Sequence, residues 1–196
     1  MRTLSKYSIW QIEMAVTASL LRLDLLCDKQ IFEYTHYLLD NEHYDDTMLS
    51  IIDDDRLYPN NKQELFRSAI SSLGFPSVTV EQASWIYTSS IIHVCSEQPE
   101  NYYIFEDSEL DIYNKFYEFL DEDSNLQKVD EFKGLIYQLD DAYDNVKMGE
   151  IYKGYNDRLT LLPLKKEFFQ LCQQWIKYNQ SKLESVFAAI YTEIRL

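Results

Sequence analysis

Four segments of this chain begin with the residue pattern that starts an α-helix. A Ser or Thr stands three residues before a Gln or Glu at Ser8 and Gln11, Thr79 and Gln82, Ser124 and Gln127, and Ser181 and Glu184. In such a capping box the hydroxyl accepts a hydrogen bond from the first helical turn, and the longer side chain reaches back to the N–H of the Ser or Thr. We therefore predict that a helix follows each pair.

Apolar residues behind these pairs recur at intervals of three and four, which is the helical period. The first stripe consists of Ile9, Ile12, Val16, Leu20, Leu23 and Cys27. The most regular stripe consists of Val129, Phe132, Ile136, Leu139, Tyr143 and Val146. Each stripe predicts the face of a helix that packs against the core.

Shorter helices are predicted in the gaps between these four. They fall near 29–40 with Asp28 as the cap, near 45–53, around 66–73 before Gly74 and Pro76, near 108–120, and over 164–178 after Pro163. Gly and Pro number only four each in 196 residues, which argues against a turn-rich β-sandwich or barrel. Since 46% of the residues are apolar, a buried core is expected. The fold class is therefore predicted as all-α: a single globular helical domain, 1–196, of about nine helices, with a possible lobe boundary near 97–106.

The charge of the chain is strongly negative and unevenly distributed. The formal net charge is −15, with 33 acidic and 18 basic residues. Residues 1–39 are neutral, residues 40–146 hold 24 acidic and six basic residues, and residues 147–196 hold five acidic and eight basic residues. Direct binding of nucleic acid is not expected, because phosphate contacts need a basic surface.

The acidic residues of the middle segment form clusters, and several tyrosines lie beside them. We predict that a basic protein partner docks on these clusters, since an acidic surface attracts a cationic partner and Tyr is favoured at interfaces. The predicted partner-binding residues are Asp53, Asp54, Asp55, Tyr102, Tyr103, Glu106, Asp107, Glu109, Asp111, Asp121, Glu122, Asp123, Asp141 and Asp144. The alternatives are an acidic surface that only keeps the protein soluble, and internal pairing with the basic C-terminal region.

The location of the protein is predicted from its cysteines and from the absence of long apolar runs. Cys27, Cys95 and Cys172 are far apart and have apolar neighbours, so we expect small buried side chains in a reducing cytoplasm. Neither a secretory signal nor a membrane span is expected.

Motifs that carry chemistry are incomplete in this sequence. Glu33 and His36 have the spacing of a di-iron ligand pair, but such sites need a second copy. The segment 53–64 has Tyr58 where a calcium-binding loop needs Gly, and Gly149 and Gly154 are not followed by the Lys of a phosphate loop. We therefore predict no enzyme activity, no cofactor and no metal, with a metal-dependent helical enzyme as the alternative.

The size, acidity and helical pattern of the chain resemble those of the immunity proteins of bacterial polymorphic-toxin and contact-dependent growth-inhibition systems. In the N-terminal part the resemblance rests on Trp10 and Ile12, Leu23 and Leu25, Tyr34 with Leu38 and Leu39, and Asp45 before Leu49. It implies a cytoplasmic inhibitor that binds a secreted toxin domain, often a nuclease, in a one-to-one complex. It assigns no functional residue. A scaffold subunit of a larger assembly is the other alternative.

Overall fold

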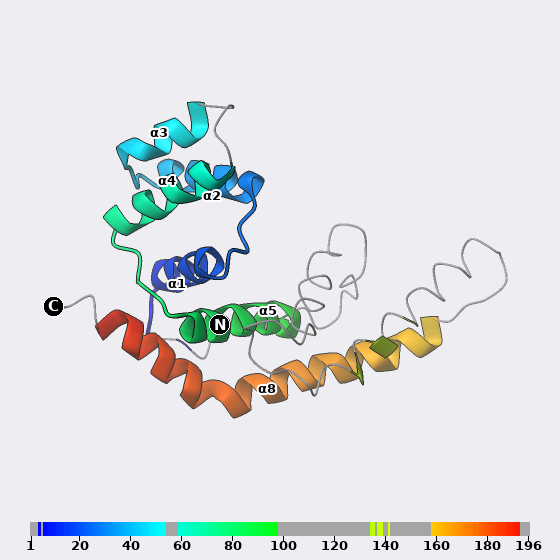
Figure 1. The fold of residues 1–196 in the computed structure, drawn as a ribbon. Coiled ribbons are helices and arrows are strands. Elements are labelled where there is room, and N and C mark those ends of the chain that lie inside the picture. Colours follow the sequence, from blue (N-terminus) through cyan, green and yellow to red (C-terminus); the bar gives the residue numbers. More distant parts are fainter. Residues whose placement is uncertain are drawn as a thin grey trace, which may run out of the picture. The chain divides into compact units, whose positions relative to one another are not determined.

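The computed structural model describes residues 4, 6–53, 59–97, 134–135, 137–138, 141 and 158–192, and the regular secondary structure of these residues is entirely helical. Its helices are α1 (Ile9–Arg22), α2 (Asp28–Asp40), α3 (Asp46–Asp53), α4 (Pro59–Ser72), α5 (Val80–Glu97) and α8 (Arg158–Thr192) (Figure 1). The predicted all-α class is confirmed for these residues, which contain no strand. None of their helices combines the length and the apolar character that a membrane crossing requires.

The starts of α1 and α5 are the predicted capping boxes. At α1 the N–H of Gln11 donates to Ser8 Oγ at 3.1 Å, and the N–H of Ser8 donates to Gln11 Oε1 at 2.9 Å. Thr79 and Gln82 make the same pair of bonds at α5, at 3.2 and 2.8 Å. These reciprocal bonds satisfy N–H groups that have no partner inside a helix, so both helices begin where the sequence indicates.

The start of α2 differs from the prediction by one residue. Asp28 is the first helical residue and not the cap, which is Cys27. The N–H of Cys27 donates to Gln30 Oε1 at 3.0 Å, and the Asp28 carboxylate lies in the first turn, where the helix dipole favours negative charge. Cys27 is exposed, so the prediction of a buried thiol is wrong there, whereas Cys172 is buried as predicted.

Three helices end in the same way, with a left-handed residue and a hydrogen bond that spans six residues. The left-handed residues are Asp24 after α1, Glu42 after α2 and Gly74 after α4, with φ of 56°, 63° and 76°. The spanning bonds join Leu25 N to Leu20 O, His43 N to Leu38 O, and Phe75 N to Ile70 O, at 2.9, 2.9 and 3.0 Å. This is the Schellman motif, which places the residue after the turn back against the helix. Gly74 thus ends α4 as predicted.

The C-terminal part is one helix and not the predicted two. α8 runs for 35 residues from Arg158 to Thr192, with Pro163 inside it and Ser181 in mid-helix. The polar residues 179–182 contain neither Gly nor Pro, so the helix continues through them. Pro163 lies near the start of the helix, where its missing N–H removes one hydrogen bond. Six helices are found among the described residues, so the predicted count of nine is not supported, and the helices predicted at 108–120 and 124–146 lie largely outside these residues.

The chain divides into two compact units. The N-terminal unit contains Arg2–Tyr87 together with Glu184–Leu196, and the second unit contains Thr88–Leu183. The predicted lobe boundary near 97–106 lies almost entirely outside the described residues and stays a prediction.

The N-terminal unit is built on α2, α3 and α4, which pack against one another, with α1 against α4. Its largest fully buried side chains are Leu4, Ile31, Leu38, Met48, Ile51, Phe66, Ile86 and Phe187. The last turns of α8 belong to this unit: the ring of Tyr7 lies 5.3 Å from that of Phe187, and Tyr191 Oη donates to the carbonyl of Gln11. Burial raises the pKa of Tyr191, with the nearby Tyr7 adding to the rise.

In the second unit, the buried apolar residues among those described include Ile92 on α5 and Phe168, Cys172 and Trp175 on α8. The two helical segments thus each present an apolar face. His93 is also buried, with its Nδ1 2.7 Å from the carbonyl oxygen of Ser89. This hydrogen bond joins one nitrogen of the His93 ring to the backbone of the same helix, so we assign that nitrogen a structural role.

The predicted core stripe of α1 is only partly correct. Leu20 is buried, but Ile9 is 77% exposed and Ile12 and Val16 are half-buried. The core contacts come instead from Met14, Ala15, Thr17, Ala18, Ser19 and Leu21. Met14, Ala18 and Leu21 follow the same helical period as the predicted stripe, so the spacing alone does not decide which face of α1 is buried.

Candidate binding groove

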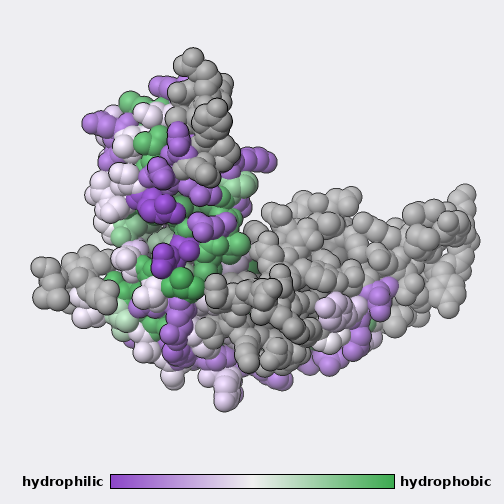
Figure 2. Space-filling view, viewed as in Figure 1, coloured by the Kyte–Doolittle hydropathy of each residue, from purple (hydrophilic) through white to green (hydrophobic). Residues whose placement is uncertain are grey.

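The half-buried stripe of α1 lines a cavity of about 520 Å³ in the N-terminal unit, which we call the α1–α2 groove. Its lining residues are Trp10, Ile12, Glu13, Met14, Val16 and Thr17 of α1, Gln30, Glu33, Tyr34, Tyr37 and Leu38 of α2, and Phe75. The volume lies within the range of ligand-binding pockets. Figure 2 shows hydrophobic surface beside hydrophilic side chains on one face of this unit.

The residues of each wall share a helical face. Ile9, Ile12, Glu13 and Val16 follow an i, i+3, i+4, i+7 pattern on α1, and Gln30, Glu33, Tyr34 and Tyr37 follow it on α2. The groove is therefore walled by two helices along their length, which is the arrangement that accepts an amphipathic helix or an extended segment.

Trp10 is held in place by aromatic rings on two sides. The ring of His43 stacks parallel to it, with ring centroids 4.1 Å apart, and Phe75 meets it edge-on at 5.7 Å. His43 and Phe75 each follow a Schellman turn, at the ends of α2 and α4, so the helix ends fix both partners. The indole is thereby positioned before any ligand arrives.

Each wall carries one exposed carboxylate. Glu13 of α1 accepts a hydrogen bond from Tyr37 Oη at 2.9 Å, which connects the two walls. Glu33 of α2 lies 3.7 Å from Lys29 Nζ in an exposed i, i+4 pair. Such a pair contributes little to stability in water, so Glu33 remains able to bind another cation.

The two tyrosines of the groove are held in the neutral form. Donation to Glu13 raises the pKa of Tyr37, and burial raises the pKa of Tyr34, with the negative charge of Glu13 adding to the rise. A tyrosine hydroxyl is already protonated at neutral pH, and both shifts act in the same direction. The negative charge of the groove comes from Glu13 and Glu33.

This chemistry fits a cationic side chain with an apolar stem. Aromatic faces attract Lys and Arg, the carboxylates pair with their charge, and Ile12 and Val16 cover the methylenes. His36 packs edge-on against Phe32, with ring centroids 4.5 Å apart, and the part of the chain that the structure describes contains no cluster of three metal-ligating side chains.

Of the fourteen predicted partner-binding residues, only Asp53 and Asp141 are described. Asp53 is exposed at the end of α3, and Asp141 is exposed in the second unit. The other twelve lie outside the described residues: Asp54, Asp55, Tyr102, Tyr103, Glu106, Asp107, Glu109, Asp111, Asp121, Glu122, Asp123 and Asp144. The predicted acidic docking surface therefore stays a prediction.

The groove residues carry no motif in the sequence that marks them as a site. Glu13 and Glu33 lie in the electrically neutral segment 1–39, and the apolar stripe that contains Ile12 and Val16 predicts a core position for both. One signal was available: Glu13 interrupts an apolar stripe, with Ile12 before it and Val16 one turn later.

No protein-family model, curated protein or solved structure matches this chain. The groove itself is therefore the basis for the function.

Proposed function

We propose that this protein binds and neutralises a basic protein partner, and that the α1–α2 groove receives a cationic, amphipathic segment of that partner. The single observation that carries the proposal is the groove itself, an apolar and aromatic channel with a carboxylate on each wall. The proposed activity is binding, with no catalytic step and no cofactor.

Exposed apolar surface beside the groove supports a macromolecular partner. Ile9 lies one turn before Ile12 on the same face of α1, outside the lining residues, and its side chain is 77% exposed. Exposed apolar surface bordered by polar groups is typical of interaction sites in soluble proteins. A partner that covers this stripe removes it from water, with about 25 cal/mol gained per Å² of apolar surface.

Charge supports a basic partner. The net charge of −15 attracts cations at long range and accelerates their encounter, and the carboxylates of Glu13 and Glu33 provide short-range contacts at the groove. The acidic clusters of residues 40–146 contribute to the attraction in this proposal, whichever of them touches the partner.

The resemblance to immunity proteins gives the proposal its biological form: an inhibitor that acts in the cytoplasm against a toxin domain. Trp10, Ile12, Tyr34 and Leu38, on which part of that resemblance rests, all line the groove. A groove that holds a basic segment of the toxin would block the surface that a nuclease uses for nucleic acid, because carboxylates take the place of phosphates.

A defined probe tests the groove: a synthetic amphipathic helix with leucines on one face and lysines on the other, titrated calorimetrically. The double variant E13K/E33K places like charges against the probe and is expected to weaken binding at least about 50-fold. The control E64K/E167K makes the same change in net charge at two exposed positions that do not line the groove, and its binding should stay within about threefold of wild type. An equal loss of peptide affinity in both variants would mean that the peptide responds only to the net charge of the protein and not to the groove.

Co-expression tests the inhibitor function. The product of the gene beside this one is produced in bacteria with wild-type protein, E13K/E33K or E64K/E167K. Wild type and the control are expected to restore growth, and E13K/E33K to fail. If wild type gives no protection and forms no complex with that product, the immunity function is wrong, while the peptide titration still decides whether the groove binds cations.

A further inference from the structure

A second cavity of about 520 Å³ lies in the N-terminal unit and has the opposite chemistry. Its lining contains Arg22 and Arg67 and no acidic residue, together with Ser71, Ser77 and Thr79. The rest of the lining is mainly apolar, from Leu21 of α1, Ile70 of α4 and the segment Phe75–Val78. We call this cavity the arginine pocket.

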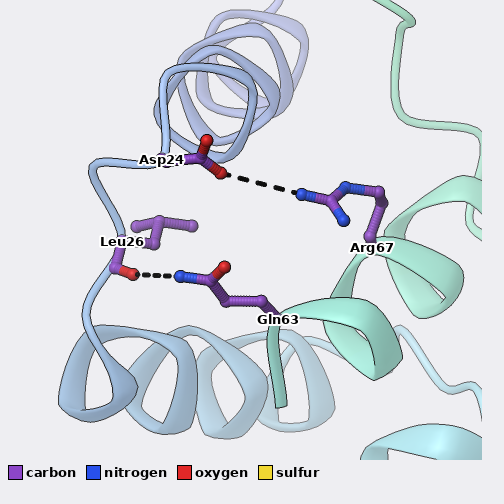
Figure 3. Close-up of polar contacts among 4 residues, drawn as sticks. All are labelled: Asp24, Leu26, Gln63 and Arg67. Atoms are coloured by element: carbon purple, nitrogen blue, oxygen red, sulfur yellow. Dashed lines mark hydrogen bonds and ion pairs between the residues drawn. The ribbon is translucent and has the colours of Figure 1, made fainter. Parts of the chain in front are cut away.

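Arg67 reaches from α4 toward the turn after α1. Its Nη2 atom lies 3.9 Å from Asp24 Oδ1, and Gln63, one turn earlier on α4, donates to the Leu26 carbonyl at 3.3 Å (Figure 3). The hydrogen bond from Gln63 connects α4 to the turn after α1 through two uncharged groups. The Asp24 pair is long and both side chains are more than half exposed, so it contributes little to stability.

Arg22, in the last turn of α1, also lines the pocket. A guanidinium carries several N–H donors in a fixed plane and binds oxyanions in a bidentate manner. Two guanidinium groups along one cavity match an anion with two charges and several acceptor oxygens. The exposed hydroxyls of Ser71 and Ser77 add neutral donors.

We propose that the arginine pocket binds a small phosphate monoester with an apolar or aromatic body. Arg22 and Arg67 bind the dianionic phosphate, which carries close to two charges at neutral pH. Leu21, Ile70 and Phe75 cover the body of the ligand. The start of α5 is not needed as a donor, because Thr79 and Gln82 cap each other.

The probes are phenyl phosphate, inorganic phosphate and phenol, titrated into the full chain and followed by NMR of the arginine side-chain N–H groups. Phenyl phosphate is expected to bind with a Kd below about 1 mM, as two charge-assisted contacts allow. Inorganic phosphate should bind more weakly, because it lacks the apolar body, and phenol should leave the arginine signals unchanged. Equal affinity for the two phosphates would overturn the apolar part of the proposal.

Two variants that should weaken phenyl phosphate binding and one that should strengthen it distinguish a binding role of the arginines from a structural role. R22Q and R67Q are each expected to weaken phenyl phosphate about tenfold, with K29Q, which makes the same charge change on α2, as the control. D24N frees Arg67 and should strengthen binding about threefold, and Asn accepts the left-handed backbone at this position. D53N is the matched control for D24N. Unchanged affinity in R22Q and R67Q, or weaker binding in D24N, would overturn the proposal.

Discussion

The α1–α2 groove and the arginine pocket are lined by different parts of the same helix. α1 contributes Ile12, Glu13 and Val16 to the groove, and Ala18, Leu21 and Arg22 to the pocket. Phe75 lines both. A segment without net charge need not be electrostatically uniform once it is folded. The four acidic and four basic residues of 1–39 cancel in number, but Glu13 and Glu33 line the groove and Arg22 lines the pocket.

Charge reversal on either side should produce the largest effects. E13K/E33K is expected to remove binding of the lysine-rich peptide and to leave phenyl phosphate within about twofold of wild type, because none of the charged residues of the pocket changes. R22E/R67E should remove binding of phenyl phosphate and leave binding of the lysine-rich peptide unchanged. Calorimetry with both ligands on both variants measures the separation, and a loss of both ligands in either variant would mean that the two cavities act as one site.

Phe75 should affect both ligands. Phe75→Ala removes an aromatic wall from the groove and from the pocket, so we expect each affinity to fall about tenfold. Trp10→Ala is the comparison variant, since Trp10 lines only the groove. It should weaken the peptide and leave phenyl phosphate unchanged.

Asp45 supports the unit that holds both cavities, through α3 and α4. Its carboxylate accepts the N–H of Thr47 at 3.0 Å, which caps α3, and the hydroxyl of Ser72 at the end of α4. Asp45→Ala is expected to lower the free energy of unfolding by about 1 kcal/mol at neutral pH, measured by urea denaturation. The ratio of the peptide and phosphate affinities should not change.

The Asp45 contribution has a definite pH dependence. Hydrogen bonds from Ser72 and Thr47 hold the pKa of the Asp45 carboxyl below its usual value, which is about 3.9. Since the native pKa is the lower one, the stabilisation is complete above about pH 4 and is lost as the pH falls through the native value. The stability difference between wild type and Asp45→Ala should therefore shrink only in acid. A difference that shrinks between pH 8 and 6 would contradict this assignment.

The smallest expected effect concerns stability at the end of α2, beside the groove. Glu42 has a left-handed backbone at the end of α2, just before His43, which stacks on Trp10. Glu42→Gly relieves this conformation and should raise the free energy of unfolding by about 0.5–1 kcal/mol. Glu64→Gly, within α4, is the control and should lower it by about 1 kcal/mol. Phosphate binding should respond to neither.

Local signals in the sequence predicted much of the fold. The pairs Ser8 and Gln11, and Thr79 and Gln82, act through contacts three residues apart, so they can be identified without tertiary structure. Ser181 and Glu184 form the same pattern inside α8, where the continuing helix makes a cap unnecessary. A capping box therefore indicates a helix start only where the preceding residues cannot extend a helix.

The groove was not predicted because its residues meet only in three dimensions. Phe75 reaches Trp10 through a turn 65 positions along the chain, and Tyr37 reaches Glu13 across two helices. The apolar residues of α1 cover most of its circumference, so the period identified a helix but not its buried face. The charge distribution did not indicate the groove either, because segment 1–39, which contains Glu13 and Glu33, has no net charge.

The most direct test of the central claim is a map of amide chemical-shift changes when the lysine-rich amphipathic peptide is titrated into isotope-labelled protein. We expect the changes to concentrate on residues 9–17 of α1, residues 30–38 of α2 and Phe75, and to disappear in E13K/E33K. Changes confined to the acidic stretches 106–111 and 121–123, with α1 and α2 unaffected, would show that the basic partner docks elsewhere and that the groove is not its binding site.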